Sequence, residues 1–174
     1  MKTIVIIPAR MASSRFPGKP MKEIHGVPMI GHVYKRSKMS KKLNEVYVAT
    51  CDQEIADYIL SINGKVIMTS MEHERASDRS AEAMLKIEKM LKKTIDIVVM
   101  IQGDEPMVTP SMIEKSLSPF SDSKINVVNL MSRIKTIEEF EDPNEPKVVF
   151  DKNIVPNLNC LHINAICTKN NTGV

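Results

Sequence analysis

The chain has 174 residues and a formal net charge of +3, with 43% hydrophobic and 26% charged residues. This composition is typical of a globular domain. With no basic stripe and no apolar run approaching ~20 residues, we expect neither a nucleic-acid nor a membrane partner. The odd number of cysteines (Cys51, Cys160 and Cys167) fits a reducing interior, so we expect a cytoplasmic protein without a signal peptide.

Apolar runs alternate with helical patterns, which predicts βαβ units in an α/β fold with a mostly parallel sheet and helices on both faces. The most hydrophobic run, residues 95–101, is the expected central strand. The expected strands are residues 3–8, 45–50, 65–68, 95–101, 125–131 and 147–150. The expected helices are residues 28–39, 53–62, 77–93 and 110–117, with a helical turn at 137–140.

Residues that favour helix N-caps precede three of these helices. Asp52 precedes the second predicted helix and Thr109 precedes the fourth. Before the long third helix, either Ser77 or Asp78 could be the cap, with Glu82 as the partner in a capping box.

Residues 154–174 differ in composition from the rest of the chain. Lys169 is the one charged residue in this segment, and asparagines are frequent. Because no regular period is visible, the sequence predicts no helix or strand there. We therefore divide the chain into a folded domain, residues 1–153, and an atypical tail, residues 154–174. A truncated or frame-shifted reading is one hypothesis for the tail, and comparing the three frames of the encoding DNA would test it.

A basic loop follows the first strand, where Pro8 interrupts the hydrogen bonding of a central strand. Arg10, Arg15 and Lys19 supply three permanent cations. A plain connection is usually about 4–6 residues long, and longer ones tend to be functional. Because ligands of open α/β sheets bind at the carboxyl ends of the strands, we expect this loop to hold a polyanion such as a phosphate chain.

An acidic segment, residues 102–106, directly follows the expected central strand and so lies at the same sheet edge. Mg²⁺ bound to a triphosphate takes one or two protein carboxylates and completes its shell with phosphate and water oxygens. Asp104 is the candidate ligand, while Glu105 would point away or stabilise the turn. Gly103 would let the backbone pass close to a ligand. The alternative is that these acids only cap the next helix.

A third cluster, residues 73–79, precedes the long helix. It could cap that helix, bind a base or a phosphate through free N–H groups, or do both, and Arg79 could pair with a carboxylate instead of a ligand. Cations for a phosphate chain and an acid for Mg²⁺ suit attack of an acceptor oxygen on a nucleotide α-phosphate, because that chemistry rests mostly on positioning and charge stabilisation.

These segments resemble the CMP-sugar synthetases, most closely the 3-deoxy-manno-octulosonate (KDO) cytidylyltransferases. The resemblance covers residues 2–153. Its specific motifs are residues 6–20 and 102–106, and its weaker ones are residues 48–50, 68–70, 77–79 and 146–149. The resemblance implies a Rossmann-like nucleotidyltransferase fold and transfer of a cytidylyl group from CTP to an acidic sugar, with Mg²⁺ as the cofactor.

The resemblance also assigns roles to residues of this chain. The implied substrate-binding residues are Pro8, Ala9, Arg10, Ser13, Arg75, Ser77 and Gln102. The implied catalytic residues are Arg15, Lys19 and Asp104. The basic loop would hold the triphosphate, residues 75 and 77 would recognise cytosine, and Asp104 would bind the metal.

The chain departs from the family pattern in two places. The paired aspartates that follow the second strand in the family are Cys51 and Asp52 here. Family members also continue past this length, with a second metal-binding aspartate and a sugar-binding, dimer-forming region, so a homodimer is implied by resemblance alone. Three hypotheses stay open: transfer to KDO, the same chemistry on an acylneuraminate, and a catalytically impaired nucleotide-binding remnant.

Overall fold

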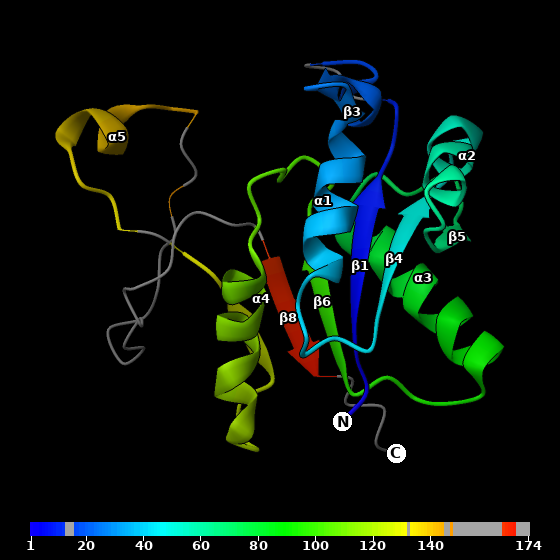
Figure 1. Ribbon diagram of the computed structural model, residues 1–174. Helices are drawn as coiled ribbons and strands as arrows, with labels where there is room; N and C mark the ends of the chain where they lie inside the picture. The colour runs from blue at the N-terminus through cyan, green and yellow to red at the C-terminus, as the bar shows by residue number, and fades with distance from the viewer. Residues whose placement is uncertain (13–15, 132, 145–146, 148–164, 170–174) are drawn as a thin grey trace.

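The computed structural model describes residues 1–12, 16–131, 133–144, 147 and 165–169, which form a sheet flanked by helices (Figure 1). The sheet has the strand order β5-β4-β1-β6-β8-β7. Its strands are β1 (Thr3–Ala9), β4 (Glu45–Thr50), β5 (Val66–Met68), β6 (Ile97–Ile101), β7 (Val127–Asn129) and β8 (Ala165–Lys169). The helices are α1 (Met29–Lys38), α2 (Gln53–Ser61), α3 (Ala76–Leu91), α4 (Pro110–Leu117) and α5 (Ile137–Glu141).

Four of these strands run parallel. β1 lies between β4 and β6 and pairs in parallel with both, while β5 extends the parallel set beyond β4. This arrangement confirms the predicted α/β fold and the inner position of β6. Thr109 caps α4 as expected, because its hydroxyl accepts a hydrogen bond from the Met112 N–H.

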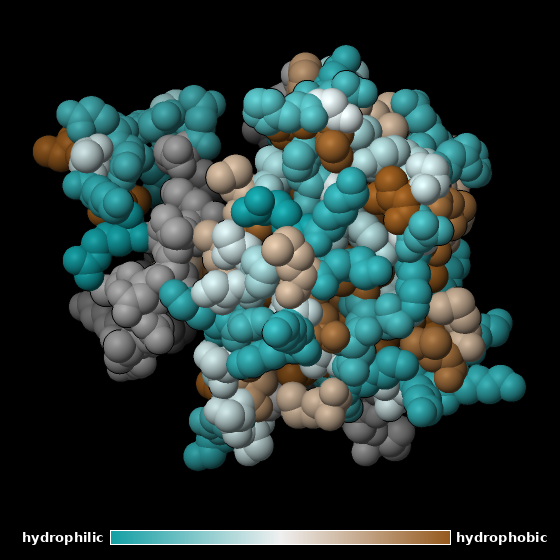
Figure 2. Space-filling view, in the orientation of Figure 1, coloured by the Kyte–Doolittle hydropathy of each residue, from teal (hydrophilic) through white to brown (hydrophobic). Residues whose placement is uncertain are grey.

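Alternation along β1 divides the core into two layers. Val5 and Ile7 pack in the layer that contains residues of α1, α2 and α4, whereas Ile4 and Ile6 pack in the layer that contains residues of α3. Side chains of a strand point alternately to opposite faces, so a strand that is apolar at every position is buried on both. Helices therefore cover both faces, as predicted, and hydrophilic side chains cover most of the surface visible in Figure 2.

The expectation that residues 154–174 hold no regular element is wrong. β8 pairs antiparallel with both β6 and β7, and Figure 1 shows it beside β6 with the opposite direction. A strand whose order comes from partners far away in sequence leaves no periodic signal of its own, which is why the composition misled the prediction.

Other boundaries moved by a few residues. The strand expected at residues 125–131 is shorter, as β7, and the helical turn expected at residues 137–140 is present as α5. Of the strand expected at residues 147–150, Lys147 is described and is not in a strand, and the rest lies outside the described residues. Among the described helices, none is long and apolar enough to cross a bilayer.

The last residues of β1 pair with β4 on one side but not with β6 on the other. β1 pairs with β6 only as far as Ile6, but it pairs with β4 as far as Ala9, so the strand continues past Pro8 on one side. Proline has no N–H to donate, and a one-sided ladder accommodates it. The close approach at Gly103 is to this strand: a Cβ on Gly103 would lie 3.0 Å from the Pro8 carbonyl oxygen and 3.3 Å from the Ala9 Cβ.

We expect Gly103→Ala to destabilise the protein by about 1–3 kcal/mol, because the added methyl overpacks this contact and the Pro8 backbone has to move. Urea titration followed by circular dichroism would measure the free energy of unfolding. If the variant were as stable as the wild type, the backbone at the end of β1 could move away from the added methyl group at no cost in free energy, and the prediction would be wrong.

Candidate functional site

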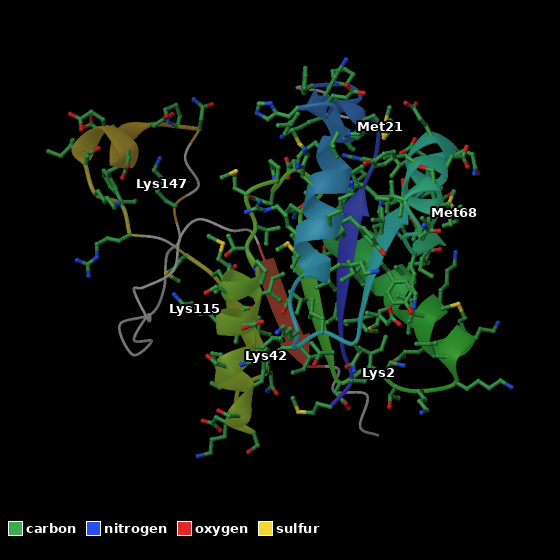
Figure 3. The ribbon with its side chains drawn as sticks, viewed as in Figure 1. Lys2, Met21, Lys42, Met68, Lys115 and Lys147 are labelled. Carbon is green, nitrogen blue, oxygen red and sulfur yellow. The ribbon has the colours of Figure 1, made fainter. Side chains whose placement is uncertain are left out.

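A cavity of about 310 Å³ lies at the carboxyl ends of β1 and β6. In Figure 3 this is the end of the molecule labelled by Met21, opposite Lys2. Three segments form its wall: the end of β1 with the basic loop, the connection before α3 together with the start of α3, and the turn after β6. The lining residues are Pro8, Ala9, Arg10, Ala12, Lys19, Pro20, His73, Glu74, Arg75, Ala76, Arg79, Gln102, Gly103 and Asp104.

Lys19 and Asp104 meet in this cavity. The Lys19 Nζ lies 2.7 Å from the Asp104 Oδ2, although the two residues are 85 positions apart in sequence. This confirms the expectation that the basic loop and the acidic turn share one sheet edge. The side chains are 36% and 47% exposed, and ion pairs this exposed typically contribute about 0–1 kcal/mol. A ligand could therefore separate the two groups at small cost.

Asp52 stands at the N-cap of α2 as predicted, but its side chain anchors the basic loop instead of bonding to the helix. Its Oδ2 accepts a hydrogen bond of 2.8 Å from the Met11 N–H, and no side-chain cap forms at the start of α2. The Gly18 N–H in turn donates to the Met11 carbonyl, and Gly18 adopts a φ of 71°, which favours glycine. These two hydrogen bonds at Met11 fix the position of Gly18, and the next residue, Lys19, lines the cavity. Ser13 and Arg15 lie outside the described residues.

The predicted cap of α3 is wrong. The helix begins at Ala76, so Ser77 and Asp78 lie inside its first turn, and Arg75 stands at the N-cap without a side-chain hydrogen bond. The Ser77 hydroxyl donates to Asp78 instead, and Ser77 is exposed and absent from the cavity wall. Arg75 does line the cavity, and so does the first residue of the helix.

Two side chains of α3 hold the connection that precedes it. Arg79 is only 2% exposed and donates to the Thr69 hydroxyl and the His73 carbonyl, so its expected carboxylate partner is replaced by neutral oxygens. Glu82 makes no capping box. Its carboxylate accepts hydrogen bonds from the Ser70 N–H at 2.9 Å and from the Lys86 Nζ, and it pairs with the His73 ring at 2.5 Å.

These contacts stabilise the ionised form of Glu82. The Lys86 ammonium is the largest cause, followed by the Ser70 N–H, and together they lower the pKa of Glu82 from 4.5 to about 2 against the opposing effect of desolvation. The carboxylate is thus charged at neutral pH and holds its partners throughout the physiological range.

The structure therefore brings seven of the ten predicted residues to one cavity: Pro8, Ala9, Arg10, Lys19, Arg75, Gln102 and Asp104. Their roles stay predictions. The site prediction missed His73, Glu74 and Arg79. The sequence gives no signal for His73 and Glu74 beyond their place in the third cluster, and for Arg79 it indicates a carboxylate partner as readily as a ligand. In the described part of the chain, no group of three or more His, Cys, Asp or Glu side chains could by itself hold a metal.

A sequence model of the cytidylyltransferases matches residues 4–160. The chain belongs to this family. Over 153 residues it is 44% identical to the 3-deoxy-manno-octulosonate cytidylyltransferase of Geobacter metallireducens, a match that covers 87% of this chain and 58% of that protein. It is 42% identical to the 8-amino-3,8-dideoxy-manno-octulosonate cytidylyltransferase of Shewanella piezotolerans, over 87% of this chain and 61% of that protein. The chain thus spans about three fifths of the length of these relatives.

Solved structures agree with this assignment. A CMP:2-keto-3-deoxy-manno-octonic acid synthetase complexed with CTP superposes with a TM-score of 0.82 at 33% identity, over 97% of this chain and 74% of that one. A cytidylyltransferase from Leptospira borgpetersenii shares the fold, with a TM-score of 0.61 at 24% identity. The predicted nucleotidyltransferase fold is therefore confirmed.

We expect the Glu82 contacts to weaken in acid. The pKa of Glu82 is lower in the folded protein than the ordinary 4.5, so its contribution is complete above that pH and is lost as the pH falls toward 2. Glu82→Gln should therefore lower the free energy of unfolding by about 1–3 kcal/mol at neutral pH. In urea titrations the gap to the wild type should narrow below pH ~4. A gap that stayed constant into acid would contradict this assignment.

Proposed function

We propose that this protein transfers a cytidylyl group from CTP to KDO or a KDO-type acidic sugar, giving the CMP-sugar and pyrophosphate. The observation that carries the proposal is the meeting of Lys19 and Asp104 in a cavity at the carboxyl edge of a parallel sheet. The names of the relatives and of the CTP-bound structural neighbour support it.

The basic loop suits the phosphate end of the nucleotide. Arg10 and Lys19 line the cavity and bring positive charge to it, and we expect Ser13 and Arg15 of the same loop to bind phosphate with them. In the reaction, a sugar hydroxyl oxygen forms a bond to the α-phosphorus and gives up its proton to water, while the bond from the α-phosphorus to the oxygen that bridges to the β-phosphate breaks. The electron pair leaves with pyrophosphate, and cations of the loop stabilise that charge.

Mg²⁺ fits the site as a substrate-held ion. Asp104 and Glu74 are the carboxylates of the cavity wall, and a magnesium ion takes one or two such ligands together with phosphate oxygens and water. When bound, it would neutralise charge on the phosphate chain. Asp104 is the residue we expect to hold it, after its bond to Lys19 opens.

The identity of the sugar rests on the relatives. The Geobacter metallireducens protein is named for KDO and the Shewanella piezotolerans protein for its 8-amino derivative, so a KDO-type acceptor has more support than an acylneuraminate. We further propose a cytoplasmic homodimer, for which light scattering after size exclusion would be the direct test of assembly.

A second candidate is a protein that binds CTP without transferring it. The observation that favours it is that Asp104 has no cluster of further metal-binding side chains around it among the described residues. Calorimetric titration with CTP, UTP and ATP, followed by a pyrophosphate-release assay with CTP, Mg²⁺ and KDO, separates the candidates. Release of pyrophosphate supports transfer, CTP binding without release supports the second candidate, and absence of CTP binding refutes both.

We expect Lys19→Ala to weaken CTP binding about 10- to 100-fold, because a charge-assisted hydrogen bond contributes roughly 1.5–3 kcal/mol. Lys22→Ala is the matched control, since Lys22 is exposed, lies three residues away and does not line the cavity. Calorimetry would measure both. Equal affinities of the two variants for CTP would remove Lys19 from the phosphate site.

We expect Asp104→Asn to abolish metal-dependent turnover, with a loss of about 100-fold or more, because a neutral amide replaces the metal's carboxylate ligand. Thermal stability should change little, since Asp104 is exposed. Glu105→Gln makes the same change one residue later, outside the cavity wall. If pyrophosphate release persists in Asp104→Asn at the rate of Glu105→Gln, the metal assignment is wrong.

A further inference from the structure

One wall of the cavity is a connection with no helix or strand of its own. Residues 69–75, here called the strap, join β5 to α3 and contribute His73, Glu74 and Arg75 to the cavity. Most of its side chains are exposed. Few buried contacts therefore fix its position, and hydrogen bonds have to do so.

Glu82 supplies several of these bonds although it does not itself line the cavity. Its Oε2 accepts from the Ser70 N–H at the start of the strap and pairs with the His73 Nε2 further along. Its Oε1 pairs at 2.7 Å with Lys86, whose Nζ also donates to the carbonyl of Met68, just before the strap. The Glu82 carboxylate thus attaches the strap to α3 at two points, Ser70 and His73.

Arg79 completes the attachment. It lies one turn before Glu82, a spacing that puts the two side chains on the same face of the helix. Its buried guanidinium donates to the Thr69 hydroxyl and to the carbonyl of His73. His73 is therefore held twice, by its ring through Glu82 and by its backbone through Arg79.

The order of the strands puts the strap and the acidic turn on opposite sides of β1. Asp104 follows β6 on one side of β1, whereas the strap follows β5 on the other side, beyond β4. Phosphates that bind at Lys19 and Asp104 would direct the rest of the nucleotide, its sugar and base, toward the strap.

We propose that Glu82 is a positioning residue which, through His73, fixes the strap against the nucleoside end of the bound nucleotide and so sets affinity and base preference. The inference rests on the proposed function, since it concerns the same cavity. The proposal distinguishes the part of the site that binds the nucleoside from the part that binds the phosphates. Loss of Glu82 weakens binding of the nucleoside and leaves binding of the phosphates unchanged.

The test compares CTP with pyrophosphate, which lacks a nucleoside. In calorimetry, Glu82→Gln should bind CTP about 10-fold more weakly and lose part of its preference for CTP over UTP, while pyrophosphate affinity stays within about twofold. Glu72→Gln is the matched control, because it makes the same change on an exposed side chain of the strap. Wild-type CTP affinity in Glu82→Gln, or equal losses for CTP and pyrophosphate, would overturn the proposal.

A double-mutant cycle tests the route through His73. If Glu82 acts by placing His73, then CTP binding in Glu82→Gln/His73→Ala should be little weaker than in His73→Ala alone. Losses that add would mean that Glu82 acts in another way, and would contradict the proposal.

Hydrogen exchange checks the attachment without any nucleotide. In Glu82→Gln, but not in Glu72→Gln, the amides of residues 69–75 should exchange about 10-fold faster or more, while those of β1 and β6 keep their protection. Unchanged exchange in the strap overturns the inference even if the wild type binds CTP. Failure of the wild type to bind CTP, with faster exchange in the strap, would instead refute the proposed function and leave the attachment supported.

Discussion

Parallel pairing of β1 with β6 is the constraint on which the candidate site depends. It places the basic loop and the acidic turn at one sheet edge, and the contact of 2.7 Å between Lys19 and Asp104 is its direct consequence. Opposite charges that are close and half-exposed hold each other weakly, so both remain available to a ligand. A phosphate chain and a cation together would satisfy the two groups better than they satisfy each other.

Local sequence patterns were enough for most of the fold. Continuous apolar runs, such as residues 4–7 of β1 and all of β6, predicted a buried parallel sheet, and Thr109 before Pro110 marked the start of α4. The parts of the site that follow from the topology could also be predicted from the sequence. Residues just after β1 and just after β6 lie at the same edge of the sheet. This is why Arg10, Lys19, Gln102 and Asp104 were predicted to lie together, and all four line the cavity.

Contacts between residues that are distant in sequence, or that lie in an irregular connection, could not be predicted from the sequence. Asp52, next to a helix start, has the local pattern of a cap, yet it bonds to Met11, which is 41 residues away. Glu82 fitted a capping box, but the helix starts before Ser77 and frees its carboxylate for Ser70 and His73. In each case a polar side chain that could cap its own helix bonds instead to a different segment of the chain. The same is true of the backbone of β8, whose hydrogen-bond partners in β6 are far away in sequence.

The most direct measurement of the central claim is a double-mutant cycle on metal-free CTP binding with Lys19→Ala, Asp104→Asn and the double variant, followed by calorimetry in a chelating buffer. If the two groups share one triphosphate site, Asp104→Asn should strengthen CTP binding by about threefold or more when Lys19 is present, because it frees the ammonium. In the Lys19→Ala background the same change should have much less effect. Equal effects of Asp104→Asn in both backgrounds would show that the pair is incidental to nucleotide binding, and would contradict the account.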